Sequence, residues 1–253
     1  MTKHIIRALV GSVCLLLVFL TGCSTAPKVD PNAPPPRVDK DVILDQNTRY
    51  PLQVYDPWEG FNRQVYRFNA LFDRHVFLPV VSGYETITPK FMRTGISNFF
   101  SNLRDIRNLV NSVLQLKGEK AASTSARFVV NTTIGLLGFI DVATPMDLQQ
   151  QNEDFGQTLG VWGAGQGPFL VLPLLGPSSV RDGIGLGVDS FIQAEIRDEI
   201  MGLKSREEVA LALLNAIDTR YRIGFRYHET GSPYEYDLVR MLYTKLRALQ
   251  VAN

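Results

Sequence analysis

DPWEGFNRQVYRFN, residues 56–69, carries the pattern that decides the fold of this chain. Asp56 is an acid able to cap a helix, Pro57 suits the first helical position, and Glu59 fits a capping box. Behind this start, large apolar side chains recur at spacings of three and four residues, which predicts one apolar stripe along a helix. The stripe consists of Trp58, Phe61, Val65, Phe68, Phe72 and Val76.

The same spacing returns in three later segments. Residues 90–116 contain a long stripe that begins at Ile96, residues 210–217 contain a shorter one, and residues 238–246 contain a weaker one. No segment alternates apolar and polar residues cleanly over six positions, as a half-buried strand would. We therefore predict an all-α domain over residues 55–250 with Gly- and Pro-rich connections.

The first 23 residues have the features of a bacterial lipoprotein signal. Lys3 and Arg7 precede the apolar run ALVGSVCLLLVFL at residues 8–20, which is shorter than the roughly 20 residues that span a bilayer. The run ends in Leu20-Thr21-Gly22-Cys23, which resembles a lipobox. We predict a signal peptide over residues 1–22, removed before Cys23, and covalent lipid on Cys23 as the anchor.

Residues 23–54 are predicted to form a tether from this lipidated cysteine to the domain. The segment is rich in proline, which favours extended chain over packed helix. Ser24 stands where an aspartate would retain a lipoprotein at the inner membrane in enterobacterial-type sorting. We therefore expect an outer-membrane protein that faces the periplasm.

Composition narrows the function classes. The 253 residues include 26 basic and 25 acidic side chains, so neither nucleic-acid binding nor bulk electrostatic attraction to membranes is expected. Cys14 lies in the predicted signal and Cys23 is the lipid site, which leaves the domain without a disulfide or a cysteine ligand. No apolar run in the domain is long enough to predict a spanning helix.

The middle of the chain is unusually apolar for connecting segments. Residues 128–143 read FVVNTTIGLLGFIDVA, and residues 155–187 mix glycines and prolines with large apolar side chains. Two interpretations are open from the residues alone. The segments form tightly packed core turns where glycine permits close approach, or they present apolar surface to lipid.

The motifs of common enzyme classes are incomplete. Gly176-Pro177-Ser178-Ser179-Val180 lacks the second glycine of a nucleophile elbow, and His228-Glu229 lacks the second histidine of a zinc-protease helix. We predict no catalytic site, no metal site and no cofactor apart from the lipid on Cys23. Buried ion pairs are expected instead, between aspartates and arginines such as Asp105, Asp141, Asp182, Arg104, Arg127 and Arg181.

Four motifs in order resemble a known family. They are DPWEGFNRQVYRFN (56–69), NTTIGLLGFIDVA (131–143), DFGQTLGVWGAGQGPFLVLPLLGPSSVRDGIG (154–185) and SPYEYDLVR (232–240). Together they are similar to the MlaA, or VacJ, family of outer-membrane phospholipid-transport lipoproteins. The resemblance implies a helical ring with an amphipathic central channel, lying in the inner leaflet of the outer membrane.

The resemblance also implies a function and partners. Phospholipids misplaced in the outer leaflet would enter the channel and pass to a periplasmic phospholipid carrier protein, and the lipoprotein would associate with trimeric outer-membrane porins. The alternative is an adaptor lipoprotein that organises porins without conducting lipid.

The channel and gate can be assigned by segment from this resemblance. The hairpin beside the channel corresponds to residues 135–143, the channel mouth to residues 66–69, and the glycine-rich ring wall to residues 160–176. The expected channel and gate residues are Gly135, Leu136, Leu137, Gly138, Phe139, Ile140, Phe68 and Asn69.

Overall fold

The computed structural model describes residues 54–202, 205–229 and 231–253, without the side chains of 197–201 and Ser205. These residues belong to a unit spanning residues 34–253. The predicted signal peptide, Cys23 and nearly all of the predicted tether lie outside the described residues. The predictions made for them are therefore not addressed by the fold.

The predicted helices are present with small shifts of their ends. Helix α2 spans Glu59–Phe72 and continues through a π-helical turn, Asp73–Phe77, into α3, Leu78–Ile87. Helix α4 covers Lys90–Leu114, close to the predicted 90–116, and is followed by α5, Gly118–Thr133. The remaining helices are a 3₁₀ turn at Thr144–Met146, α6 (Phe155–Val161), α7 (Val180–Met201), α8 (Ser205–Arg222) and α9 (Glu235–Ala252).

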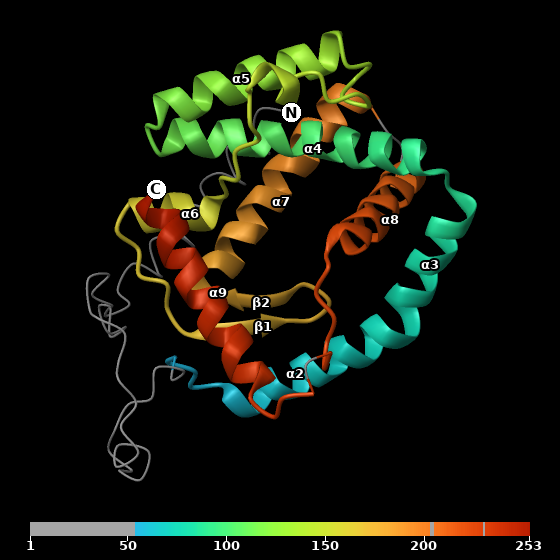
Figure 1. The fold of residues 1–253 in the computed structure, drawn as a ribbon. Coiled ribbons are helices and arrows are strands. Elements are labelled where there is room, and N and C mark those ends of the chain that lie inside the picture. Colours follow the sequence, from blue (N-terminus) through green and yellow to red (C-terminus); the bar gives the residue numbers. More distant parts are fainter. Residues whose placement is uncertain (1–53, 203–204, 230) are drawn as a thin grey trace. The chain divides into compact units, whose positions relative to one another are not determined.

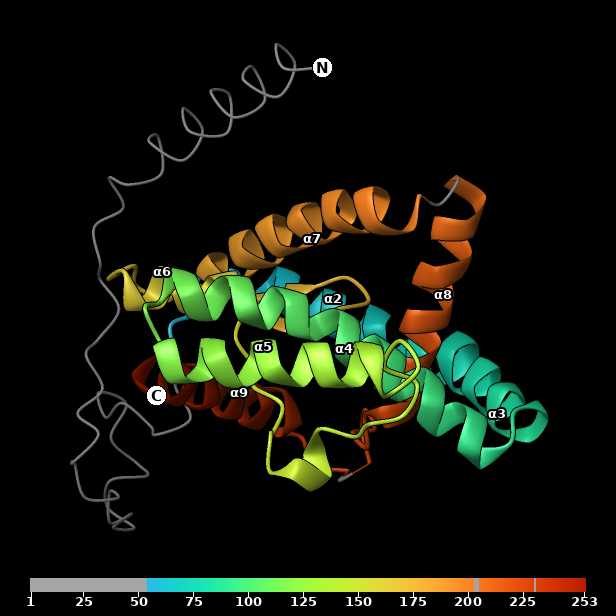
Figure 2. The same ribbon diagram turned by 90° about the horizontal axis from the view of Figure 1, so that it is seen from above.

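Within this unit the helices are arranged in a ring (Figure 1). The continuous run from α2 through α3 leads into α4, and α8 packs against both α3 and α4. Helix α5 lies alongside α4 in both Figure 1 and Figure 2. Helix α6 packs against α7 and α9 and thereby closes the opposite side. This confirms a predominantly helical, ring-like domain.

One short sheet departs from the all-α prediction. Strands β1 (Phe169–Leu172) and β2 (Gly176–Ser179) pair antiparallel, with Phe169 opposite Ser179 and Leu172 opposite Gly176. Each strand has only four residues, and β2 contains Gly-Pro, so neither could show the alternation on which strand prediction depends. The hairpin forms part of the segment 160–176 that we assigned to the ring wall.

The first helix starts later than its sequence indicates. Asp56 does not cap α2, because Trp58 occupies the position before Glu59 and contributes no side-chain cap. Instead, the Asp56 carboxylate accepts hydrogen bonds from the Tyr236 hydroxyl at 2.6 Å and from Asn62 Nδ2 at 2.8 Å. The motif 56–69 therefore fixes α2 against α9 as well as starting a helix.

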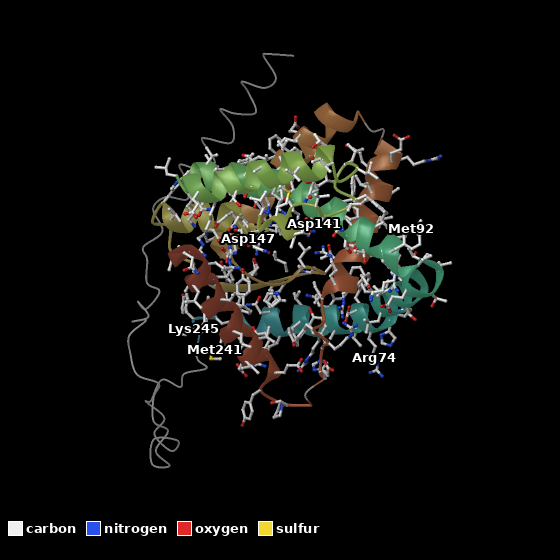
Figure 3. All side chains as sticks on the ribbon, turned by 45° about the horizontal axis from the view of Figure 1, so that its top comes forward. Arg74, Met92, Asp141, Asp147, Met241 and Lys245 are labelled. Carbon is white, nitrogen blue, oxygen red and sulfur yellow. The ribbon has the colours of Figure 1, made fainter. Side chains whose placement is uncertain are left out.

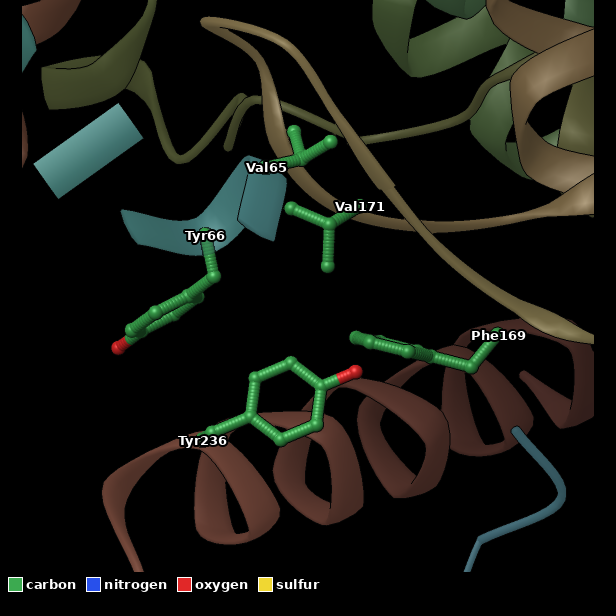
Figure 4. Close-up of a cluster of buried hydrophobic side chains, with 5 residues drawn as sticks. All are labelled: Val65, Tyr66, Phe169, Val171 and Tyr236. Atoms are coloured by element: carbon green, nitrogen blue, oxygen red, sulfur yellow. The ribbon is translucent and has the colours of Figure 1, made fainter. Parts of the chain in front are cut away.

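The apolar core lies where α2, the hairpin and α9 meet. Figure 4 shows its five buried members, which come from these three elements. The Tyr236 ring packs edge-on against the Tyr66 ring, with centroids 5.6 Å apart. The core consists of Val65, Tyr66, Phe169, Val171 and Tyr236.

Candidate functional site

Polar side chains fill most of the interior that the structure describes. Buried polar groups need hydrogen-bond partners, so a polar interior is costly unless it is fully bonded. Many side chains with nitrogen or oxygen atoms point into the ring in Figure 3. Among the largest side chains with less than 2 % exposure, Val171 is the only apolar one, and the others are Gln157, Glu153, Asn62, Asn108, Asn111, Thr124, Thr158, Asp105, Asp218, Ser112 and Ser179.

Helix α2 exposes large apolar side chains and buries polar ones, the inverse of a helix on the surface of a water-soluble protein. Most of its predicted apolar stripe is exposed, with Trp58 46 % exposed and Phe61 and Phe68 exposed to a similar degree. Val65 of the same stripe is the exception, because it is buried in the apolar core. The opposite face buries Asn62 and Asn69. A surface helix of a water-soluble protein presents the reverse arrangement, with its apolar stripe towards the core.

The same inversion appears in α9, and α4 buries polar side chains in the same way. Helix α4 buries Asn102, Asp105, Asn108, Asn111 and Ser112, while Val113 is exposed. Helix α9 buries Arg240 and Arg247 and exposes four leucines at helical spacing. No helix in the described ranges is long and apolar enough to cross a membrane. The exposed leucines are Leu238, Leu242, Leu246 and Leu249.

Asparagine side chains join α2 to the hairpin. Asn62 accepts from the Val171 backbone N–H at 2.9 Å and donates to the Phe169 carbonyl at 3.1 Å. Two helical turns later, Asn69 donates to the Leu172 carbonyl at 2.9 Å and accepts from the Leu174 N–H at 2.8 Å. Each side-chain amide therefore both donates to and accepts from the backbone of the hairpin, as a neighbouring strand would. Their spacing of seven residues was a signal in the sequence that our prediction of an apolar stripe overlooked.

Arg127 is the centre of one buried ionic network. Its guanidinium lies 3.1 Å from Asp105 and 2.9 Å from Asp141, and it also donates to the Leu148 carbonyl at 2.7 Å. Burial would raise the pKa of Asp141, but hydrogen bonds from Thr144 and Arg127 lower it to about 2. This network fixes α4, α5 and the segment after α5 relative to one another.

Arg247 is the centre of a second network between α6, α7 and α9. It binds Asp154 at 2.7 Å and Asp182 at 2.8 Å, and Arg181 also pairs with Asp182 at 3.0 Å. Burial would raise the pKa of Asp154, but Arg247 and Gln157 together lower it to about 2. Asp154 also caps α6, because its carboxylate accepts the Gln157 N–H at 2.9 Å.

The predicted ion pairs are confirmed for Arg127 and Arg181 and wrong for Arg104. Arg127 pairs with Asp105 and Asp141, and Arg181 pairs with Asp182. Arg104 instead donates to the Ser101 hydroxyl at 2.6 Å, and no carboxylate within the described residues lies within ion-pair distance. Asp105, its neighbour in sequence, points towards α5 and Arg127 because the two side chains leave α4 in different directions.

The predicted gate residues form one tight loop after α5. Leu136, Leu137 and Gly138 all have positive φ, at 52°, 58° and 88°. Both leucines are 67 % exposed, so burial of their side chains does not offset the cost of their strained backbone. Ile140 is exposed in the same loop. The loop therefore combines apolar exposure with backbone strain.

This loop docks on α4 through glycines. The Phe139 ring fits against Gly95, where any side chain would overlap it. A methyl group at Gly138 would overlap the Asn102 side chain, and one at Gly135 would overlap the Ile140 carbonyl. Asn98 Nδ2 donates to the Phe139 carbonyl at 3.2 Å. The predicted gate residues 135–140 thus lie together against α4.

Phe68 and Asn69 lie on a different element from this loop. Phe68 is on the exposed face of α2, and its ring centroid lies 6.0 Å from that of Phe72. Asn69 is buried and bonded to the hairpin turn. Neither the channel nor the gate role of these residues is tested by their positions, and both roles stay predictions.

Comparison with known proteins identifies the family. A family model described as MlaA lipoprotein matches residues 54–250. The chain belongs to the MlaA lipoprotein family. The match covers every helix from α2 to the last turns of α9.

Curated relatives carry the MlaA name. An intermembrane phospholipid transport system lipoprotein MlaA of Haemophilus influenzae is 30 % identical over 192 residues, covering 75 % of this chain and 67 % of its own. The MlaA of Escherichia coli K12 is 39 % identical over 140 residues, 54 % of this chain and 56 % of its own. An uncharacterized Rickettsia prowazekii protein is 39 % identical over 148 residues, covering 57 % of this chain and 59 % of its own, less than two thirds of its length.

A solved structure shares the fold. It comes from work on the structural basis for maintenance of bacterial outer membrane lipid asymmetry. It superposes with a TM-score of 0.62 at 30 % identity and covers 78 % of this chain and 98 % of the solved chain. The ring of helices is therefore common to this chain and that MlaA-type structure.

Proposed function

We propose that this protein removes mislocalised phospholipids from the outer leaflet of the outer membrane and passes them to a periplasmic phospholipid carrier. Membership of the MlaA family supports the proposal, as does the name of its relatives as parts of an intermembrane phospholipid transport system. The single observation that carries it is that α2 and α9 expose large apolar side chains while they bury polar ones, among them Asn62, Asn69, Arg240 and Arg247.

The apolar exterior supports a position within one lipid leaflet. Each Å² of apolar surface removed from water contributes about 25 cal/mol. The exposed leucines of α9 and the aromatic residues of α2 would gain this energy against acyl chains and lose it in water. A ring that lies in the plane of one leaflet would place this exterior against hydrocarbon.

The polar interior supports passage of a headgroup. Exposing two acyl chains to water costs roughly 20 kcal/mol or more at ~0.8 kcal/mol per CH₂, so the chains must stay shielded from water. The charged headgroup has the opposite need, because an unsolvated charge is costly. An amphipathic central channel through the ring, with hydrogen-bonding groups on one side and hydrocarbon on the other, would meet both needs.

The loop of residues 135–140 is the proposed gate of this channel. Its strained backbone and its exposed leucines support two arrangements of similar energy, since strain lowers the cost of leaving one conformation. Gly135 and Gly138 would let the loop move closely past α4, and Phe139 would hold it when docked at Gly95.

The remaining assignments follow from the family and the sequence. Lipid on Cys23 would anchor the protein at the periplasmic face of the outer membrane, because two or more acyl chains are needed for stable anchoring. Trimeric porins and the periplasmic carrier are the proposed protein partners. No enzymatic step is proposed.

A complementation experiment tests the function. The protein would be expressed in a Gram-negative strain that lacks its own MlaA-family member, and outer-leaflet phospholipid would be measured by labelling intact cells. We expect surface phospholipid to return to the wild-type level, and a Cys23→Ala variant to fail because it is not anchored. Unchanged surface phospholipid with normal porin association would instead support the adaptor alternative.

A further inference from the structure

Two arginines of α4 differ from the paired arginines of the described interior. Arg104 and Arg107 are half-buried and lie one turn apart, yet among the described side chains they hydrogen-bond only to neutral groups. Arg226 is also half-buried, but its guanidinium is met by the Ile223 and Phe225 carbonyls. The arginines that do lie within ion-pair distance of a carboxylate are Arg63, Arg93, Arg127, Arg181, Arg220, Arg222, Arg240 and Arg247.

Arg104 lies at a cavity between α4, α7 and α8. The cavity is small and partly open to solvent. Its polar lining besides Arg104 is Gln193 and Asn215, and Asn215 Oδ1 is buried without a hydrogen-bond partner. Its apolar lining residues are Phe100, Leu103, Ile106, Ile196 and Leu211.

The charge of Arg104 is poorly compensated at this place. Burial and the neighbouring cations Arg222 and Arg107 together lower the pKa of Arg104 to about 10, although Asp218 and Asp105 act in the opposite direction. Asp218 is committed to Arg222 at 2.9 Å, and Asp105 is committed to Arg127 at 3.1 Å. A half-buried cation that has no counter-ion among the described side chains is costly, so an anion bound here would be stabilised.

The lining specifies which anion suits the cavity. Guanidinium groups bind phosphate oxygens through paired hydrogen bonds, and an amide such as Asn215 can donate a further one. The apolar walls favour an anion that carries hydrocarbon over a fully hydrated ion. We infer that Arg104, together with Asn215, binds the phosphate diester of a phospholipid at the junction of α4, α7 and α8. This inference rests on the proposed function and adds the site of headgroup recognition to it.

The first test measures lipid binding by the full-length, lipidated protein held in amphipol. The probe is dihexanoylphosphatidylglycerol below its micelle concentration, titrated by calorimetry. Charge-assisted bonds to phosphate predict that R104Q weakens binding about tenfold or more. The affinity of R104K should lie between those of wild type and R104Q, because lysine keeps the positive charge but cannot donate the paired hydrogen bonds of a guanidinium. R74Q, the same change at an exposed arginine, should stay within about twofold of wild type.

A second variant protects the test against a folding defect. N215D places a carboxylate in the cavity, where it competes with the phosphate for Arg104 while it offers the arginine a partner. We expect N215D to weaken binding of the phospholipid about as strongly as R104Q and to keep the helical circular dichroism of wild type. Dihexanoylglycerol, which lacks the phosphate, should bind wild type and all variants equally.

Each outcome decides the inference. Wild-type affinity in folded R104Q, or in N215D when R104Q does not fold, would overturn it. Displacement of the lipid by inorganic phosphate at similar concentration would also overturn it, because the site would then be one for a free ion. If wild type restores surface phospholipid in cells and R104Q does so equally, the inference fails alone. If wild type itself fails in cells, the proposed function fails.

Discussion

At the scale of single residues, interior charges determine how α6, α7 and α9 meet. Asp154 binds Arg247 through both oxygens, at 2.7 and 2.8 Å, and caps α6 at the same time. Asp154→Asn keeps a capping side chain and removes the charge. We expect a loss of about 3 kcal/mol in the free energy of unfolding at neutral pH, as for a broken buried pair. Asp147→Asn, at an exposed residue with φ of 63°, is the matched control and should have little effect.

The same aspartate predicts the direction of a pH effect. Its pKa is about 2 in the folded protein against an ordinary 3.8, so its contribution is present above about pH 4 and is lost as the pH falls towards 2. Linkage gives a loss of about 2 kcal/mol from this group. Between pH 7 and 2.5, the free energy of unfolding measured by chemical denaturation should decline less in Asp154→Asn than in wild type. Parallel declines in the two proteins would contradict this assignment.

Charge pairing could be predicted from sequence only in part. Buried pairs of Asp105, Asp141 and Asp182 with arginines were expected, and Arg127 and Arg181 form them. Arg104 was also expected to pair and does not, because Asp105 is engaged by Arg127 and Asp218 by Arg222. Composition can count the charges in a segment, but the helix face that each occupies depends on packing between distant elements.

At the scale of elements, α2 acts as a partner for the β1–β2 hairpin. Asn62→Ala removes the acceptor of the Val171 N–H and the donor to the Phe169 carbonyl. Because both backbone groups are buried, we expect a loss of about 3 kcal/mol in the free energy of unfolding. Gln64→Ala, on an exposed position of the same helix, is the control. Equal unfolding midpoints for the two variants would rule out this role for Asn62.

The proposed gate loop, residues 135–140, allows a separate prediction. Gly138→Ala adds a methyl group that meets Asn102 at a φ of 88°, which costs about 1 kcal/mol or more. If the loop is the gate, complementation by this variant should leave surface phospholipid raised. Gly83→Ala, in α3 with open space around it, should complement fully. Full complementation by Gly138→Ala, and by Gly135→Ala as well, would count against a gate here.

Element prediction succeeded where periodicity was strong and failed where the element was short. Stripes at spacings of three and four located α2, α4, α8 and α9 correctly, because that spacing survives whichever face is buried. The four-residue strands β1 and β2 gave no periodic signal. The stripes also could not reveal which face points inwards, since a helix in lipid and a helix in water share the same period.

At the scale of the whole molecule, the proposed position in lipid depends on the apolar side chains that the helices of the ring expose. The interpretation of the middle segments as packed core turns fits Phe169 and Val171, which are buried. The lipid-facing interpretation is supported by Leu136, Leu137 and Trp162, which are exposed. The same apolar stretches therefore contain both buried core residues and exposed residues that could face lipid.

Contact between the apolar exterior and lipid hydrocarbon can be measured with the two tryptophans of the chain. Trp58 and Trp162 are 46 % and 57 % exposed and lie on α2 and at the end of α6. The protein would be reconstituted in vesicles whose acyl chains carry bromine, and Trp58→Phe and Trp162→Phe variants would separate the two signals. If the apolar exterior faces hydrocarbon, bromine should quench the fluorescence of both tryptophans strongly. Fluorescence that stays unquenched by bromine and open to an aqueous quencher would contradict the account.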